Sequence, residues 1–286
     1  FDNVRNQFEP KKWILLWMSG ARIVDAIVAN AKSWLCAACV LLAGCGSELS
    51  PMGRLSLEAG RQAFADGNHG SVRMHMTDVL CEGMRTSGAP EALYYRGRST
   101  AALGDTANAR VDLEKALAIA KDKNLAGGCA LLLGDLDYDE GAFADALRYY
   151  DLALANLPVN ETPADHVGLR LASLLQRFGQ WERADVILDR LIFHFEGTPR
   201  AREAGRIIRC RSWTINAGAY ESRNEAASLV QRLKDNNLPA RIDEIVWRDC
   251  MLQAVNVGSF DKYDQADEAL PDVKRHIDCA VVMESR

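Results

Sequence analysis

The sequence has few aromatic residues, no excess of basic residues and no apolar run long enough to cross a membrane. Phe, Trp and Tyr make up 7% of the 286 residues, while Ala and Leu recur throughout, a balance that favours helices over a β-sandwich. Lys and Arg number 34 against 39 Asp and Glu, so the net charge of -5 gives no electrostatic reason to expect nucleic acid as a partner. Because 48% of the residues are apolar and 26% are charged, a disordered chain is excluded as well.

The sequence also lacks the motifs that would indicate catalysis or metal binding. Its five His residues have no metal-ligand spacing, and it contains no nucleophile elbow, phosphate-binding loop or dinucleotide fingerprint. The eight Cys residues are scattered along the chain, so they do not form a disulfide framework. We therefore expect a protein that is not an enzyme and needs no metal or other cofactor.

An uncharged apolar segment lies near the start of the chain. Residues 34–44 read WLCAACVLLAG, which suits the core of a signal peptide (about 7 to 15 residues) better than a bilayer span (about 20). The segment ends in LAGC, which resembles the bacterial lipobox. This resemblance implies a signal peptide over 1–44 with Met18 as the true start, lipidation at Cys45, and a lipid anchor in the bacterial cell envelope, facing the periplasm. The alternative is an amphipathic or buried helix over residues 13–44.

A glycine recurs at a nearly fixed spacing through the middle of the chain. Gly67, Gly104, Gly141 and Gly179 follow one another at intervals of 37, 37 and 38 residues, and each stands between two helix-like segments. Around the third glycine, the positions of Gly134, Ala146, Tyr150 and Pro158 resemble the tetratricopeptide repeat (TPR). We expect a linker over 45–55, followed by four stacked helix pairs that form a TPR-like solenoid over 56–210.

The TPR resemblance implies a concave groove that takes a protein or peptide partner. Four acidic residues could line this groove: Asp135, Asp137, Asp139 and Glu140. A run of charge at a repeat turn is more often a solvated face, so both interpretations stay open.

The last 75 residues follow a different pattern. Residues 212–220 and 250–260 read as strands, and a helix-like run and another strand-like run follow each of them. The two halves superpose at a shift of 40, which places Asn216 on Asn256 and Gly218 on Gly258. We expect a βαββαβ domain over 212–286 with both helices on one sheet face, so the fold class is mainly α with a C-terminal α+β domain.

The strand ending VNVGSF and the duplicated half resemble the SPOR (sporulation-related) domain. This resemblance implies binding to peptidoglycan, preferably to denuded glycan strands, through the open face of the sheet. Alternation of side chains predicts that Thr214, Asn216 and Gly218 lie on that face and that Ala219 lies beneath the helices. The candidate glycan-binding residues are Trp213, Asn216, Tyr220, Asn256, Ser259 and Phe260.

Three alternatives remain open for this domain. The rings of Tyr220 and Phe260 could pack into the core instead of contacting a ligand. The whole protein could be an envelope assembly adaptor whose C-terminal domain docks a protein or dimerises, which an apolar open face would favour. A disulfide between Cys250 and Cys279, which lie in two predicted strands, is a further hypothesis.

Overall fold

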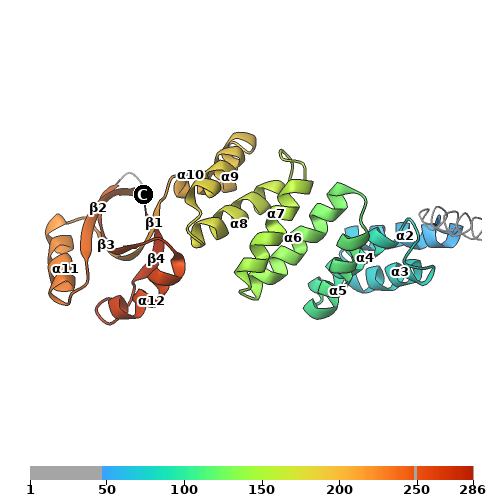
Figure 1. Cartoon of the computed structure of the whole chain (residues 1–286), viewed down its shortest axis with the longest axis horizontal. Helices are drawn as coiled ribbons and strands as arrows, with labels where there is room; N and C mark the ends of the chain where they lie inside the picture. The colour runs from blue at the N-terminus through green and yellow to red at the C-terminus, as the bar shows by residue number, and fades with distance from the viewer. Residues whose placement is uncertain (1–46, 248–249, 286) are drawn as a thin grey trace, which may run out of the picture.

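The computed structural model describes residues 47–247 and 250–285. Within these ranges, nine helices come first and a four-stranded sheet with two more helices follows (Figure 1). The first nine helices are α2 (Pro51–Ala65), α3 (His69–Cys81), α4 (Ala89–Ala102), α5 (Thr106–Ile119), α6 (Lys123–Asp139), α7 (Phe143–Asn156), α8 (Ala164–Arg177), α9 (Trp181–His194) and α10 (Pro199–Ile207). The predicted signal peptide and Cys45 lie outside the described residues. In the described part, no helix is both long and apolar enough to span a bilayer.

The four recurring glycines form the turns inside four helix pairs, as the sequence predicted. Gly67, Gly104, Gly141 and Gly179 have φ angles of 72°, 86°, 77° and 75°, in the left-handed region that favours glycine. At the first two turns the next residue caps the second helix: Asn68 and Asp105 accept hydrogen bonds from the backbone N–H groups of Ser71 and Asn108. The period seen in the sequence therefore reflects a repeated turn conformation.

Small residues allow the two helices of a pair to approach closely. A Cβ atom added to Gly134 in α6 would lie 2.9 Å from the ring of Tyr150 in α7, which is completely buried. Gly97 in α4 faces Leu113 in α5 in the same way, at 3.0 Å. The interior of the solenoid is therefore closely packed, and larger side chains at these glycines would force the helices apart.

The first helix begins earlier than the sequence analysis expected. α2 starts at Pro51, so residues 51–55 belong to a helix and the predicted linker is shorter by these five residues. The Ser50 side chain accepts a hydrogen bond from the N–H of Gly53, and proline is favoured at a first helical position. Before the helix, Leu49 is buried against the first repeats and Ser47 pairs with Thr86.

The C-terminal part has the predicted element order. It comprises β1 (Ser212–Tyr220), α11 (Arg223–Asp235), β2 (Ala240–Trp247), β3 (Cys250–Phe260), α12 (Tyr263–Lys274) and β4 (Val281–Ser285). All neighbouring strands are antiparallel in the order β2-β3-β1-β4. Both helices pack on one face over a core that includes Ile215, Leu233 and Val255, and Figure 1 shows them outside a curled sheet.

The proposed disulfide between Cys250 and Cys279 is wrong. Both are exposed free thiols. Cys250 begins β3 and Cys279 precedes β4, and β1 lies between these two strands in the sheet.

The sheet domain is fixed onto the fourth helix pair. Trp213 in β1 packs against Trp181 in α9, and its indole N–H donates to the carbonyl oxygen of Gln176 at 3.0 Å. Ion pairs at 2.7 Å join Arg177 to Asp264 and Arg211 to Asp185 across and beside the same junction. The solenoid and the sheet therefore share a small core.

Candidate functional site on the open sheet face

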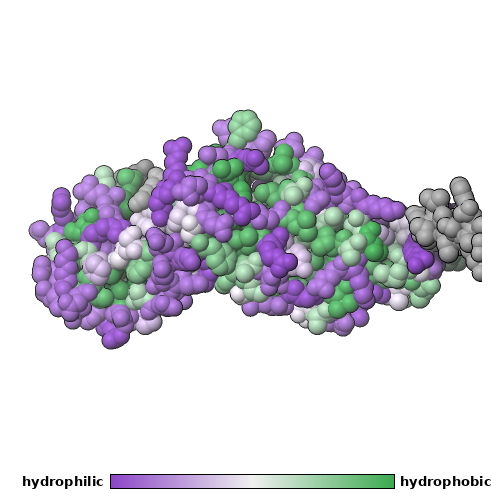
Figure 2. All heavy atoms as spheres, viewed as in Figure 1, coloured by the Kyte–Doolittle hydropathy of each residue, from purple (hydrophilic) through white to green (hydrophobic). Residues whose placement is uncertain are grey.

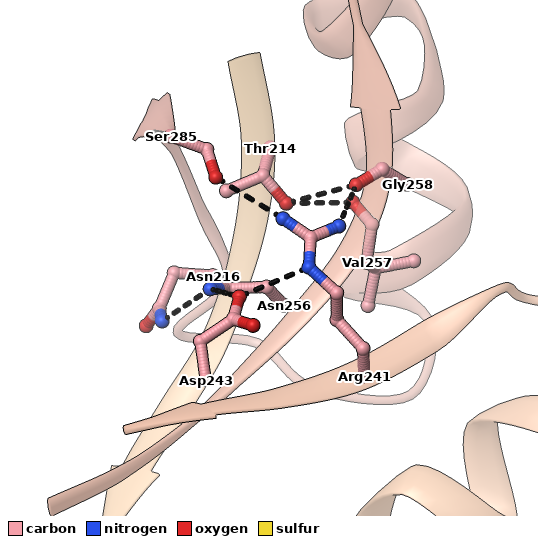
Figure 3. Close-up of polar contacts among 8 residues, drawn as sticks. All are labelled: Thr214, Asn216, Arg241, Asp243, Asn256, Val257, Gly258 and Ser285. Atoms are coloured by element: carbon pink, nitrogen blue, oxygen red, sulfur yellow. Dashed lines mark hydrogen bonds and ion pairs between the residues drawn. The ribbon is translucent and has the colours of Figure 1, made fainter. Parts of the chain in front are cut away.

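A chain of polar side chains crosses the open face of the sheet at its centre (Figure 3). Asn216 in β1 and Asn256 in β3 are direct register partners, and the Nδ2 of Asn216 donates to the Oδ1 of Asn256 at 2.9 Å. The Nδ2 of Asn256 donates in turn to the Oδ2 of Asp243 in β2 at 2.7 Å. The two asparagines that the sequence placed in equivalent positions therefore meet at the middle of the domain.

Arg241 connects this chain to the opposite edge of the sheet. Its guanidinium donates to Asp243 Oδ2 at 3.0 Å, to the carbonyl oxygen of Gly258 at 2.9 Å and to the hydroxyl oxygen of Ser285 at 3.1 Å (Figure 3). Arg241 lies on β2 and Ser285 on β4, the two edge strands, which would be about 14 Å apart in a flat sheet with strands about 4.8 Å apart. One arginine reaches across, so the sheet is curled and its open face is concave.

Arg241 and Asp243 were not among the predicted site residues. The alternation of side chains along β2 could have indicated them, because both occupy alternate positions of a strand whose other side faces a helix. What the sequence could not indicate is that the curl of the sheet brings Arg241 to β4.

Two glycines interrupt the strands beside the asparagines. Gly218 has a φ of 136° and Gly258 a φ of 72°, and the rings of Tyr220 and Phe260 lie over them. A Cβ added to Gly258 would lie 2.5 Å from the Phe260 ring, and one added to Gly218 would lie 3.1 Å from the Tyr220 hydroxyl oxygen. The repeated glycine and aromatic pair thus forms a backbone kink covered by a ring.

The kink in β1 reverses the alternation of side chains. The pairing of β1 with β3 shifts register between Asn216 and Gly218, as in a β-bulge. Ala219 is therefore exposed, and the prediction that it lies beneath the helices is wrong. Tyr220 packs instead against the helix-covered core.

The structure places the three candidate aromatic residues in packing positions. Trp213 is 6% exposed in the junction with the solenoid, so it is not available to stack on a sugar, contrary to the expectation. Tyr220 and Phe260 are half-buried against the core beneath α11 and α12, which is the alternative noted for them. Ser259 is exposed at the end of β3.

An apolar strip borders the polar chain on β4. Val281 and Met283 are 55% and 40% exposed, and their register partners are Asn216 and Thr214 on the open face. Thr214 itself is buried and donates to the carbonyl oxygens of Val257 and Gly258. Ile245 and Trp247 follow Arg241 and Asp243 at alternate positions of β2 and are 37% and 55% exposed. The open face therefore combines amide, carboxylate and guanidinium groups with apolar side chains on both edge strands.

The open face carries no net charge and no metal-binding cluster. Arg241 and Asp243 offset one another, and in the residues that the structure describes no group of His, Cys, Asp and Glu could hold a metal ion. Such a surface can donate hydrogen bonds to a neutral polar ligand and accept hydrogen bonds from it.

The acidic run in the third repeat is engaged by neighbouring side chains. Arg110 in α5 binds Asp137 at 2.6 Å and Glu140 at 2.9 Å, and Asp137 is buried. Asp135 accepts a hydrogen bond from the Tyr150 hydroxyl at 2.6 Å, and burial with this bond raises the pKa of Tyr150. Asp137 therefore lines a cavity of about 320 Å³ while paired with Arg110, and Asp139 is exposed at the last position of α6.

Several solved structures resemble the chain at low sequence identity. The MamA protein is 16% identical over 54% of this chain and 78% of its own length, with a TM-score of 0.43. A tetratricopeptide repeat protein from Parabacteroides merdae is 13% identical over 66% of this chain and 68% of its own, with a TM-score of 0.47. A thermophilic TPR protein from Thermus thermophilus is 18% identical over 64% of this chain and 90% of its own, with a TM-score of 0.37.

The helical part is a solenoid of stacked helix pairs. Its paired antiparallel helices and recurring turn glycines give that architecture. No family model matches the sequence, and no curated protein matches it.

Proposed function

We propose that the protein is a non-enzymatic scaffold of the bacterial cell envelope that binds peptidoglycan glycan strands through its sheet and a protein through its repeats. A TPR-like fold suggests a protein-interaction scaffold. The observation that carries the glycan proposal is the row of polar groups from Asp243 through Asn256 to Asn216 on a concave, uncharged face.

The chemistry of this row suits a sugar chain. Glycan strands present hydroxyl and acetamido groups, which need both donors and acceptors. Asn216, Arg241 and Asp243 are partly exposed and supply both. Asn256 is 7% exposed and holds Asn216 and Asp243 in place. The two asparagine side chains are held by one another and by Asp243, so little side-chain entropy would be lost on binding. Val281 and Met283 offer an apolar edge for the carbon-bearing faces of the rings. The domain also has the element order that the SPOR resemblance implies.

The lipid anchor at Cys45 remains part of the proposal. Ser47 pairs with Thr86 in the loop between α3 and α4, and only Gly46 separates it from Cys45. Two residues of extended chain span about 7 Å at most, so an anchored protein would hold its first repeats against the membrane. The sheet lies at the other end of an elongated molecule (Figure 1), where it would reach towards the cell wall.

The test is cosedimentation of the full chain with purified sacculi, before and after an amidase removes the stem peptides. A Cys45→Ala background keeps the lipid from contributing to sedimentation. We expect binding that rises on denuded glycan and falls in the Asn216→Ala, Asn256→Ala double variant. The matched control is Asn224→Ala, Gln231→Ala, on the exposed surface of α11. Equal retention of both double variants would remove the sheet face from the proposal.

A second candidate is docking of a protein or a second copy through the sheet. The exposed Val281 and Met283 favour it, because apolar side chains on an open sheet edge can pack against another chain. Light scattering of the folded chain tests self-association: a dimer that a Val281→Ser, Met283→Ser variant dissociates would support this role.

A further inference from the structure

A cavity of about 870 Å³ opens on the solenoid, away from the sheet. It is bounded by the loop between α3 and α4, by the first half of α4 and by the loop between α5 and α6. Its apolar lining comes from Met84, Tyr94, Tyr95, Ile119 and Leu125. A cavity of this size can accommodate several side chains of a ligand.

Residues that lengthen the repeat lie at the mouth of the cavity. The spacing of 37 residues exceeds the usual TPR period of about 34, and part of the excess lies in the loop before α6, at the mouth of the cavity. On the inner side Tyr94 lies against α6, where a Cβ added to Gly128 would be 3.2 Å from its hydroxyl oxygen. Burial raises the pKa of Tyr94, so its hydroxyl stays a neutral hydrogen-bonding group.

The rim of the cavity carries two cations that no carboxylate of the described residues pairs with, in a chain with a net charge of -5. Arg85 and Lys121 are exposed on the rim, and within the described ranges neither takes part in an ion pair. The two acidic residues of the rim are engaged elsewhere: Arg61 holds Glu91 through two hydrogen bonds of 2.6 Å, and Asp122 accepts from the backbone of Asn124 and Leu125.

The start of α4 lies on the same rim, beside Ser87 and Pro90, but adds little positive character. The N–H of Ala89 donates to the carbonyl oxygen of Thr86 at 3.2 Å, and Pro90 has no N–H. The positive charge beside this apolar, tyrosine-lined cavity therefore comes from Arg85 and Lys121.

We propose that this cavity binds an extended segment of a partner protein in which an apolar side chain is flanked by carboxylates. The apolar side chain enters between Tyr94 and Leu125, and the carboxylates pair with Arg85 and Lys121. Ser87 and Asn124, both exposed on the rim, can hydrogen-bond to a peptide backbone, which an acyl chain could not use. The inference rests on the proposed protein-binding role of the repeats and is independent of the sheet.

Apolar patches interrupt the hydrophilic surface along the repeats in Figure 2, so the test must distinguish this cavity from the rest of the solenoid. A phage-displayed random dodecapeptide library is panned on the full Cys45→Ala chain, and enriched peptides are then measured by fluorescence anisotropy. The test variant is Arg85→Glu, Lys121→Glu. The matched control is Lys123→Glu, an exposed lysine two residues from Lys121 and outside the cavity lining.

We expect enriched peptides to carry Phe, Leu or Met beside Asp or Glu. The double charge reversal should weaken their binding by about tenfold or more, and the control should stay within about twofold. Enrichment of basic or uncharged peptides, binding that the double variant retains, or a cavity that binds laurate but enriches no peptide would each overturn the proposal.

The sacculus assay separates this result from the sheet proposal. Arg85→Glu, Lys121→Glu should leave sacculus binding unchanged, and Asn216→Ala, Asn256→Ala should leave peptide binding unchanged. Loss of one activity alone therefore identifies which of the two proposals fails.

Discussion

The solenoid and the sheet domain both arise from sequence repetition, but their glycines are required for different structural reasons. In the solenoid, a Cβ added to Gly67, Gly104 or Gly141 would meet no atom within 4 Å, so only the positive φ calls for glycine. In the sheet, Gly218 and Gly258 have a positive φ and also lie under an aromatic ring. The glycine of the first repeat forms a turn, and the glycine of the second forms a strand kink that an aromatic ring covers.

The helix starts of the solenoid and the open face of the sheet satisfy their polar groups over different distances along the chain. At helix starts of the solenoid, residues such as Asn68 and Asp105 bond to a backbone N–H three residues away. On the open sheet face, Asn216, Asn256 and Arg241 each have at least one partner 13 to 44 residues away. Damage to the solenoid turns should therefore stay local, whereas damage to the sheet should spread.

The largest effect is expected where the two regions meet. Trp213→Ala removes a buried ring and its hydrogen bond to Gln176, and truncation of a buried Trp costs about 3 to 5 kcal/mol. We expect the sheet to lose its fixed contact with α8 and α9, seen as faster proteolysis between α10 and β1. Trp247→Ala, at a side chain that is 55% exposed, is the control and should leave the cleavage rate unchanged.

The next largest effect compares one glycine from each region. Gly258→Ala forces a left-handed backbone, costing about 1 to 2 kcal/mol, and also places a Cβ against the Phe260 ring. Gly104→Ala carries only the backbone cost, so urea unfolding should show a clearly smaller loss of stability. Adding Phe260→Ala should make the cost of Gly258→Ala approach that of Gly104→Ala. Equal losses for the two single variants would mean that the ring adjusts freely.

How much the sequence could predict follows the same division. Some features depend on neighbours close in the chain, and the sequence predicted them correctly: the turn glycines, the duplicated strands and the polar positions of Asn216 and Asn256. The exposure of Ala219 depends on a bulge set by pairing with β3, and the burial of Trp213 depends on docking against α8 and α9. Neither contact leaves a local signal. The start of α2, by contrast, has a local signal in Ser50 and Pro51 that the sequence analysis missed.

A smaller effect tests whether the curl of the sheet matters for binding. Arg241→Met keeps much of the side-chain volume but removes the bonds to Asp243, Gly258 and Ser285. We expect a loss of about 1 to 3 kcal/mol in the free energy of unfolding, because Asp243 loses a charged partner, together with weaker retention on sacculi. Arg232→Met, on the exposed side of α11, is the control. Weaker retention with an unchanged unfolding free energy would instead point to direct contact between Arg241 and the glycan.

The smallest effect concerns the first turn of the solenoid and its dependence on pH. The backbone N–H of Ser50 donates to Glu82 at 2.9 Å and its hydroxyl also donates to this carboxylate, so the hydroxyl bond, followed by the backbone bond, lowers the pKa of Glu82 below 4.5. A carboxylate whose pKa is lower in the folded state than in the unfolded chain stabilises the fold at pH values above its unfolded-state pKa. This stabilisation is lost as the pH falls through the folded-state pKa. Acid titration of the unfolding free energy should therefore show a steeper decline below about pH 4.5 for the native chain than for Glu82→Gln. Because Glu82 is exposed, salt should weaken the difference only slightly if hydrogen bonding causes it, and strongly if nearby Arg54 does.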